Sequence, residues 1–255
     1  MKEVQLSRTE RIVLGVAGLL LTMGLWQMLA STGQIDQVIY SSPWDVATSG
    51  KRLYEQGKLV PAFRSTGTLF LVSMAISIGV AIPLGMIIGW YSRVDALLDR
   101  FLSVFYAMPR IALIPLIIAY AGLGSKSRII IVCISAIPPI LINTAAGVST
   151  IDRDHLRLAR CYLATNVDLL RTVALPGAIP TVIAGIRQGV LFGLLGVVAA
   201  EYFVGTTGIG GLIFLSGQTL HNGEVLVGAL SLGLAAIILT AGLRAIENRL
   251  DRWRT

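Results

Sequence analysis

The sequence predicts an all-α, polytopic membrane protein with six transmembrane helices and both termini in the cytoplasm. Three observations lead to this prediction. Of the 255 residues, 55% are hydrophobic and only 14% are charged, whereas a soluble protein carries about a quarter of charged residues. Six apolar stretches approach the length of about 20 residues that a helix needs to cross the hydrocarbon layer. The basic residues that give the net charge of +7 lie mainly at the ends of these stretches and form no basic stripe, so a lipid bilayer and not nucleic acid is the expected partner.

The expected transmembrane helices cover residues 12–30, 66–90, 104–121, 129–148, 178–200 and 225–243. Helices are expected because the stretches are apolar at consecutive positions, whereas the strands of a membrane barrel alternate between polar and apolar residues. The first stretch could be read as a secretory signal. Its end, Met28-Leu29-Ala30, is a poor cleavage site, so we expect an uncleaved anchor.

The distribution of basic residues predicts the orientation. With the N-terminus inside, thirteen of the 21 Lys and Arg residues fall in inner segments. Residues 1–11 and 244–255 are then cytoplasmic, residues 31–65 form a long outer loop, and residues 66–243 form a five-helix core. Within the outer loop, Ser41-Ser42-Pro43-Trp44 predicts a turn followed by a short amphipathic segment along the membrane interface.

The longest inner loop, residues 149–177, has the pattern of two short amphipathic helices. Its apolar residues recur at steps of three to five with arginines between them; they are Ile151, Leu156, Ala159, Leu163, Val167, Leu170 and Val173. Two pairs have the spacing of helix caps, Ser149 with Asp152 and Thr165 with Asp168. Leu175-Pro176 is expected to end the second helix.

The chain lacks the motifs of common enzyme sites. It has no G-x-x-x-x-G-K-[ST] phosphate loop, no HExxH and no GxSxG. Cys133 and Cys161 match no zinc or disulfide spacing, and the two histidines, His155 and His221, lie in loops. We therefore expect neither a metal site nor catalysis by this chain alone.

Small residues and prolines within the apolar stretches predict close packing and a pathway. Gly85-x3-Gly89 and Gly185-x3-Gly189-x3-Gly193 have the spacing that lets helices approach closely, within one chain or across a homodimer seam. Each proline inside a helix leaves a carbonyl without its donor, which is tolerated where helices line a cavity. Five such prolines lie in three consecutive stretches, namely Pro83, Pro109, Pro115, Pro138 and Pro139.

Charged residues within the spans are few, and each needs a cavity or a partner because a charge in lipid costs at least about 2.5 kcal/mol. They are Arg110, Arg187 and Glu201. We expect a structural ion pair for Arg187, whereas for Arg110 a structural role and a place in the pathway are equally open. The residues expected along the substrate pathway are Tyr106, Arg110, Asn143 and Glu201.

The inner loop resembles a known motif. Its pattern is Arg157-Leu158-Ala159-x3-Leu163-x9-Val173-x-Leu175-Pro176. This is similar in register to the EAA-x3-G-x9-I-x-LP loop in the membrane subunits of binding-protein-dependent ABC importers. The usual glutamate of that loop is Arg157 here, and the usual glycine is Leu163.

Other segments resemble the nitrate, sulfonate, taurine and bicarbonate branch of these permeases. Met108-Pro109 with Ala112-Leu113-Ile114-Pro115-Leu116 is similar to its I-P-x-x-A-L-x-P-L segment. The segments that follow in the expected order are Gly122-Leu123-Gly124-Ser125-Lys126-Ser127, Leu175-Pro176-Gly177-Ala178-Ile179-Pro180, Gly185-Ile186-Arg187, Ala199-Ala200-Glu201 and Gly208-Ile209-Gly210. An arginine common before the I-P segment is replaced by Tyr106.

The resemblance implies a type I ABC importer permease-like fold in a bacterial cytoplasmic (inner) membrane. The implied partners are a second copy of the chain, two cytoplasmic ABC ATPase subunits and an extracytoplasmic solute-binding protein. The chain itself would hold no cofactor, because ATP and Mg²⁺ would bind to the ATPase. The residues expected to couple the chain to the ATPase are Arg157, Leu158, Ala159, Arg160, Leu163, Val167, Asp168, Val173, Leu175 and Pro176.

The substrate implied by the resemblance is a small anion, such as a sulfonate, nitrate, bicarbonate or a carboxylate. A neutral or heterocyclic nutrient, such as a thiamine precursor, is the alternative within the same class. From another class, an ATP-independent secondary transporter or a channel would also fit six spans without an enzyme motif.

Overall fold

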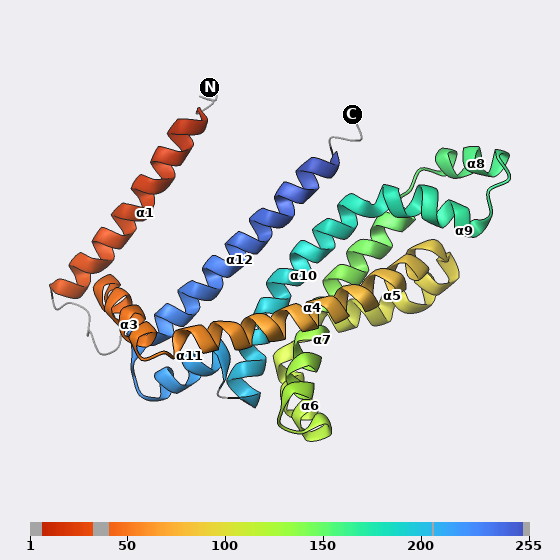
Figure 1. Ribbon diagram of the computed structural model, residues 1–255. Coiled ribbons are helices and arrows are strands. Elements are labelled where there is room, and N and C mark those ends of the chain that lie inside the picture. The colour runs from red at the N-terminus through yellow and green to blue at the C-terminus, as the bar shows by residue number, and fades with distance from the viewer. Residues whose placement is uncertain (1–6, 33–40, 206, 252–255) are drawn as a thin grey trace.

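The computed structural model describes residues 7–32, 41–205 and 207–251, and these segments form helices joined by short connections (Figure 1). No strand occurs in the described segments, so the all-α prediction is confirmed. The helices are α1 (Arg8–Ser31), α3 (Pro43–Glu55), α4 (Leu59–Trp90), α5 (Ser92–Ala107), the 3-10 turn η1 (Arg110–Leu113), α6 (Ile114–Ala121), α7 (Ser125–Ser149), α8 (Arg153–Cys161), α9 (Asn166–Leu169), the π-helical turn η2 (Leu170–Ala174), α10 (Leu175–Val204), α11 (Gly208–Gln218) and α12 (Asn222–Asp251).

Helix α7 forms the centre of the core and packs along both α4 and α10. Its residues Val132, Ala136 and Ile140 are fully buried. They belong to one continuous apolar cluster that also includes residues of α4 and α10. In a bilayer, lipid chains are as apolar as these side chains, so the hydrophobic effect does not drive the helices together. Close van der Waals contact between the helices favours their packing instead.

Glycines bring these three helices into contact. A Cβ atom added to Gly85 would lie 2.8 Å from the carbonyl oxygen of Leu141, and one added to Gly185 would lie 2.8 Å from Cβ of Asn143. Both approaches are closer than a side chain allows, so only glycine fits there. The small-residue spacing therefore reflects packing within the chain and not a seam between two copies.

Within the described residues, five continuous helices are long and apolar enough to cross a membrane. A sixth apolar segment is the pair of helices Ser92–Ala107 and Arg110–Ala121, which is bent by 90° at the break between them and makes a sixth span when the pair is counted as one. The stretch predicted over residues 104–121 thus begins earlier, at Ser92, and contains the break expected from its prolines. Pro109 causes the break: it lacks an N–H donor, and it holds the preceding Met108 in an extended conformation (φ −64°, ψ 134°).

The helix after the inner hairpin is longer than expected. Residues Asn166–Val204 form one continuous helical segment through α9, η2 and α10, so the expectation that Leu175-Pro176 ends a helix is wrong. The turn before the proline is π-helical, and the N–H of Leu175 donates to the carbonyl of Leu170, five residues earlier. This wider turn relieves the contact between a proline ring and the carbonyl four residues before it.

The predicted caps divide into one correct and one wrong pair. Thr165 and Asp168 form a complete capping box at the start of α9. Ser149 instead ends α7, and Asp152 caps α8 by accepting the N–H of Asp154 at 2.9 Å. In the predicted outer loop of residues 31–65, α3 begins after Ser42 as the short amphipathic helix that was expected. The loop is shorter than predicted, because α4 already begins at Leu59.

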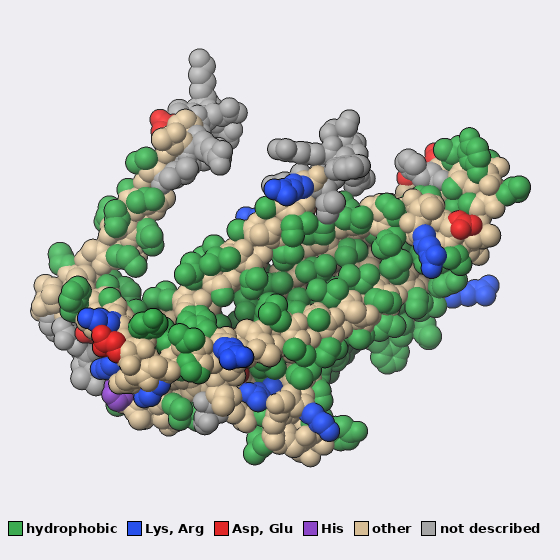
Figure 2. All heavy atoms as spheres, viewed as in Figure 1, with side chains coloured by type: hydrophobic (Ala, Val, Ile, Leu, Met, Phe, Trp, Pro, Cys, Tyr) green, Lys and Arg blue, Asp and Glu red, His purple; other side chains and the backbone are tan. Residues whose placement is uncertain are grey.

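The start of α1, the end of α12 and the hairpin of α8 and α9 lie at one end of the molecule, at the top of Figure 1. Helices α3, α6 and α11 lie at the opposite end. Hydrophobic side chains cover the surface between the two ends, and the Lys and Arg side chains gather toward the ends (Figure 2). A bilayer around the apolar middle leaves the start of α1, the end of α12 and the α8–α9 hairpin on one side.

Candidate functional site

The bend between α5 and α6 opens a cavity of about 320 Å³ against α7 and α10. Its walls are mainly apolar and include Ile114, Ile131 and Leu195. Arg110, the first residue of η1, is the only charged residue among those that line it. The proline break thus places one positive charge in an apolar pocket, where a charge has few partners.

The guanidinium of Arg110 lies against two aromatic rings, Tyr106 and Phe192, which also contact each other edge to face. Its central carbon is 4.6 Å from the ring centroid of Phe192 and 5.4 Å from that of Tyr106. Its two hydrogen bonds to described residues are long, 3.5 Å to the carbonyl of Ser135 and 3.3 Å to the carbonyl of Tyr106. Its Nε atom is buried without a partner, and the described carboxylates make no ion pair with it. The charge is therefore held in place but not neutralised.

A chain of polar side chains continues from the cavity along α7 and α10. Gln188 donates from Nε2 to the hydroxyl of Tyr106 at 3.1 Å. Asn143 donates from Nδ2 to Oε1 of Gln188 at 3.1 Å, and also to the carbonyl of Pro139 at 2.8 Å. The structure thus brings together three of the four residues expected along a pathway, Tyr106, Arg110 and Asn143.

Sequence analysis missed Gln188 and Phe192, which complete this cluster. The available signal was an amide in an apolar stretch, with an aromatic residue four positions later on the same face of the helix. This signal did not identify the two residues as part of the cluster, because Tyr106, the partner of Gln188, is 82 residues away in the sequence.

Glu201, the fourth residue, lies apart from this cluster and is fully buried. Its carboxylate accepts the hydroxyl of Thr66 at 2.9 Å and the N–H of Gly210 at 2.8 Å. Thr66 in turn accepts the N–H of Ile209 at 2.8 Å. These contacts join α4, α10 and α11, so in this structure Glu201 holds three helices together.

Arg187 also has a structural contact, as expected from its position. Its Nη1 atom lies 2.7 Å from Oε2 of Glu247 on α12, and both side chains are partly buried. The bond fastens α12 to α10.

The α8–α9 hairpin exposes apolar side chains at its turn. We call Leu158, Tyr162, Leu163 and Val167 the tip patch; the most exposed, Leu163, is 91% accessible. Leu163 has a φ angle of 60°, in the left-handed region that side chains other than glycine rarely adopt. This is the position where the resembling loops carry glycine, so the backbone geometry of the turn explains that preference.

The other expected coupling residues surround the tip patch. Arg157 pairs with Asp154 at 3.1 Å on the exposed face of α8, where Arg160 is also exposed, and Asp168 caps α9. Ala159, Val173 and Pro176 line a cavity of about 870 Å³ between α8 and the start of α10. Leu175 lies partly exposed beside them.

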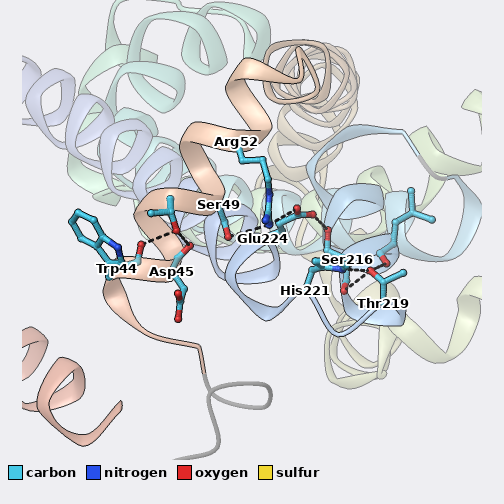
Figure 3. Close-up of polar contacts among 10 residues, drawn as sticks. Trp44, Asp45, Ser49, Arg52, Ser216, Thr219, His221 and Glu224 are labelled. Carbon is cyan, nitrogen blue, oxygen red and sulfur yellow. Dashed lines mark hydrogen bonds and ion pairs between the residues drawn. The ribbon is translucent and has the colours of Figure 1, made fainter. Parts of the chain in front are cut away.

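At the opposite end, polar contacts fix α3 to α11 and α12 (Figure 3). Arg52 points from α3 toward Glu224 at the start of α12, and the two form an ion pair at 2.9 Å. Ser216, on α11, donates to the same carboxylate at 2.7 Å. Sequence analysis did not predict this cluster, since its members are 172 and eight residues apart.

A bundle of apolar helices around a proline-broken segment, with a cavity and a projecting amphipathic hairpin, is the architecture of a multi-pass membrane permease. Residues 81–255 match the family described as binding-protein-dependent transport system inner membrane component. The chain belongs to this family, and the resemblance seen in its sequence is confirmed. As a member, it is a non-catalytic membrane component of an ABC importer, which works with an ATPase and a binding protein.

Known relatives extend over nearly the whole chain. The taurine transport system permease protein TauC of Escherichia coli (strain K12) is 27% identical over 253 residues, covering 97% of this chain and 91% of that protein. The nitrate import permease protein NrtB of Leptolyngbya laminosa is 29% identical and covers 89% of this chain and 83% of that protein. An inward-facing structure of the MetNI methionine ABC transporter matches the fold with a TM-score of 0.61 and 19% identity, over 79% of this chain and 98% of that one.

Proposed function

We propose that this chain forms the translocation pathway of an ABC importer for a small anionic solute. A solute-binding protein delivers the anion to the end of the molecule that carries α3, α6 and α11. ATP hydrolysis in separate subunits then opens the pathway toward the end that carries the α8–α9 hairpin.

Arg110 is the observation that carries the choice of an anion. A guanidinium binds sulfonate, carboxylate and nitrate groups through parallel hydrogen bonds, and such charge-assisted bonds are stronger in an apolar pocket. Arg110 makes only long hydrogen bonds to two carbonyls and has no carboxylate partner among the described residues. A neutral heterocycle would leave this charge unpaired, so an anion is the better fit.

The names of the relatives support the same class of solute. TauC and NrtB are named for taurine, which carries a sulfonate, and for nitrate. In the cavity, the hydroxyl of Tyr106 would orient the solute beside Arg110, and the amides of Gln188 and Asn143 would hold that hydroxyl in place through the hydrogen-bond chain.

The tip patch is the proposed contact with the ATPase. An apolar face on a short helix fits a groove of a partner protein. The residues involved would be those of the coupling loop, with Leu163 and Val167 at its centre. Because α9, η2 and α10 are continuous from Asn166 to Val204, a shift of the hairpin would move Gln188 and Phe192 as parts of the same rigid element.

The same end of the molecule carries the start of α1 and the end of α12, which supports cytoplasmic termini. We further propose that two copies of the chain pair in the membrane, each on one of two ATPase subunits. ATP and Mg²⁺ would bind in those subunits, and this chain would supply no ligand to them.

The test is uptake into proteoliposomes that contain this chain, its ATPase and its binding protein. We expect uptake of methanesulfonate or nitrate that requires ATP. Arg110→Gln should raise KM at least about tenfold, the scale of one charge-assisted hydrogen-bond pair, while ATP hydrolysis persists. Arg93→Gln, which removes an exposed charge on α5 away from the end where the binding protein docks, is the matched control and should leave KM unchanged.

Two results would contradict the proposal. Equal uptake of all anions by Arg110→Gln would remove Arg110 from solute binding. Uptake that proceeds without ATP would replace the importer with a secondary transporter or a channel.

A further inference from the structure

A second cavity, of about 460 Å³, lies between the first turns of α4 and of α7, at the end of the molecule opposite to the α8–α9 hairpin. Two arginines line it, Arg64 and Arg128, together with the hydroxyl groups of Ser65, Thr68 and Ser125. We propose that this cavity is a second anion site, which binds an oxyanion group such as a sulfonate, carboxylate or phosphate at the outer mouth of the pathway.

The two arginines have charge available for a ligand. The guanidinium of Arg64 makes no hydrogen bond or ion pair within the described part of the chain. Arg128 donates to the hydroxyl of Thr207 at 2.8 Å and to that of Ser125 at 3.3 Å, but its Nε atom is buried without a partner. Neutral hydroxyls satisfy hydrogen bonds but do not neutralise a cation, so the cavity keeps two positive charges.

No carboxylate forms an ion pair with Arg64 or Arg128 in the described part of the chain. Glu201 interacts electrostatically with Arg128, but it forms no ion pair with it. The Glu201 carboxylate accepts hydrogen bonds from Thr66 and Gly210. No Asp or Glu is among the residues that line the cavity.

The backbone at the cavity adds to the attraction for an anion. Ser125 is the first residue of α7, a helix of 25 residues, and the preceding Gly124 offers no side-chain cap. The N–H groups of the first turn therefore lack an intrahelical acceptor, and the helix dipole places partial positive charge there. This contribution supports the site, which stands on the two arginines and the cavity.

The site has a position that suits transfer to Arg110. Arg128 precedes Ser135 by seven residues on α7, which is about 10 Å along the helix axis. The carbonyl of Ser135 accepts a hydrogen bond from Arg110. Positive charge at a mouth raises the local concentration of an anion. As a step in transport this inference rests on the proposed function, whereas the binding site itself does not.

Direct binding of trifluoromethanesulfonate, followed by ¹⁹F NMR, tests the site. The protein is the full chain carrying Arg110→Gln, so that the first cavity does not contribute, in nanodiscs of phosphatidylcholine alone. We expect saturable binding. Adding Arg64→Gln and Arg128→Gln should weaken the Kd at least about tenfold, as expected for the loss of charge-assisted contacts.

Two further variants guard against indirect effects. Arg64→Gln alone removes a guanidinium that makes no hydrogen bond or ion pair in the described part of the chain, so no such bond is lost with it, and it should weaken the Kd at least about threefold. Lys126→Gln removes an exposed charge two residues from Arg128 that does not line the cavity, and its Kd should stay unchanged.

The same chemistry could come from a lipid headgroup. In nanodiscs that also contain phosphatidylglycerol, displacement of the probe that depends on Arg64 and Arg128 would identify the lipid as occupant, and no displacement would identify the solute. Absence of saturable binding, or equal Kd values with and without the two arginines, would overturn the site. The binding experiment contains no ATPase, so it does not depend on transport. If the probe binds in nanodiscs but the proteoliposomes show no uptake, the second site stands and only the proposed function is contradicted.

Discussion

Nη1 of Arg187 on α10 lies 2.7 Å from Oε2 of Glu247 on α12. The exposed fractions of the two side chains are 31% and 21%, so water screens the pair only in part. Much of the remaining surface of α12 is apolar and exposed, including Leu234 and Ile238. The ion pair is therefore a specific attachment of α12 to the core.

We expect Arg187→Glu or Glu247→Arg alone to lower the free energy of unfolding by roughly 1 to 3 kcal/mol, because each leaves two like charges in a partly buried position. The double exchange should recover most of the loss. Thermal unfolding in detergent measures both, with Glu55→Ala, at an exposed pair with Lys51, as a control of little effect. No recovery in the double variant would mean that the pair does not fasten α12.

The contact between α4 and α7 makes a second prediction. An alanine at Gly85 would press against Leu141 and Thr144, whereas an alanine at Gly79 on the same helix would meet open space. Gly85→Ala should therefore lower the free energy of unfolding by roughly 1 to 3 kcal/mol, the usual cost of overpacking. Gly79→Ala should be neutral or slightly stabilising. Equal midpoints of thermal unfolding for the two variants would contradict this packing.

The left-handed turn of the hairpin makes a third prediction. An L-residue in this conformation costs about 1 to 2 kcal/mol, so Leu163→Gly relieves strain, and the greater chain entropy of glycine offsets part of the gain. We expect slower hydrogen–deuterium exchange in residues 153–169. Leu163→Ala, which keeps the strain, should show no slowing. Faster exchange in the glycine variant would show that the turn is not strained.

The tip patch makes a fourth prediction. Replacing both Leu163 and Val167 by Ser should uncouple ATP hydrolysis from uptake, because the variant loses the apolar contact with its partner but no contact of its core. Uptake per ATP should fall at least about tenfold, on the scale of 1.4 kcal/mol or more of lost contact. The amount of protein in the membrane should not change. Tyr91→Ser, at an exposed residue between α4 and α5 and outside the tip patch, is the control. Normal coupling in the double variant would remove the tip patch from this role.

Much of the fold could be predicted because it depends on local sequence. The lengths of apolar stretches set where helices cross, and Thr165 with Asp168 caps a helix through bonds that span three residues. The glycine spacing predicted close packing, since residues four apart share one helical face. Three of the four predicted pathway residues also meet, because polar side chains in apolar helices tend to face a common interior.

Other features depended on contacts between distant segments. Prolines alone did not indicate that the chain bends by 90° at Pro109 but continues through Pro176, because the result depends on whether a wider turn can pack against neighbouring helices. Glu201 is buried where its carboxylate accepts a hydrogen bond from Thr66, which is 135 residues away in the sequence. Arg64 and Arg128 likewise line the same cavity only because α4 packs against α7.

The sequence by itself determined that this protein is a helical membrane permease. It also determined that a charged residue lies beside a proline break and that an amphipathic hairpin lies on the inner side. These features could be predicted because hydropathy, capping and motif spacing act within a few turns of one helix. Only the tertiary structure decided which face of each helix meets which neighbour. That choice placed Arg110 against the rings of Tyr106 and Phe192 and enclosed the second arginine cavity, because side-chain packing joins residues that the sequence keeps far apart.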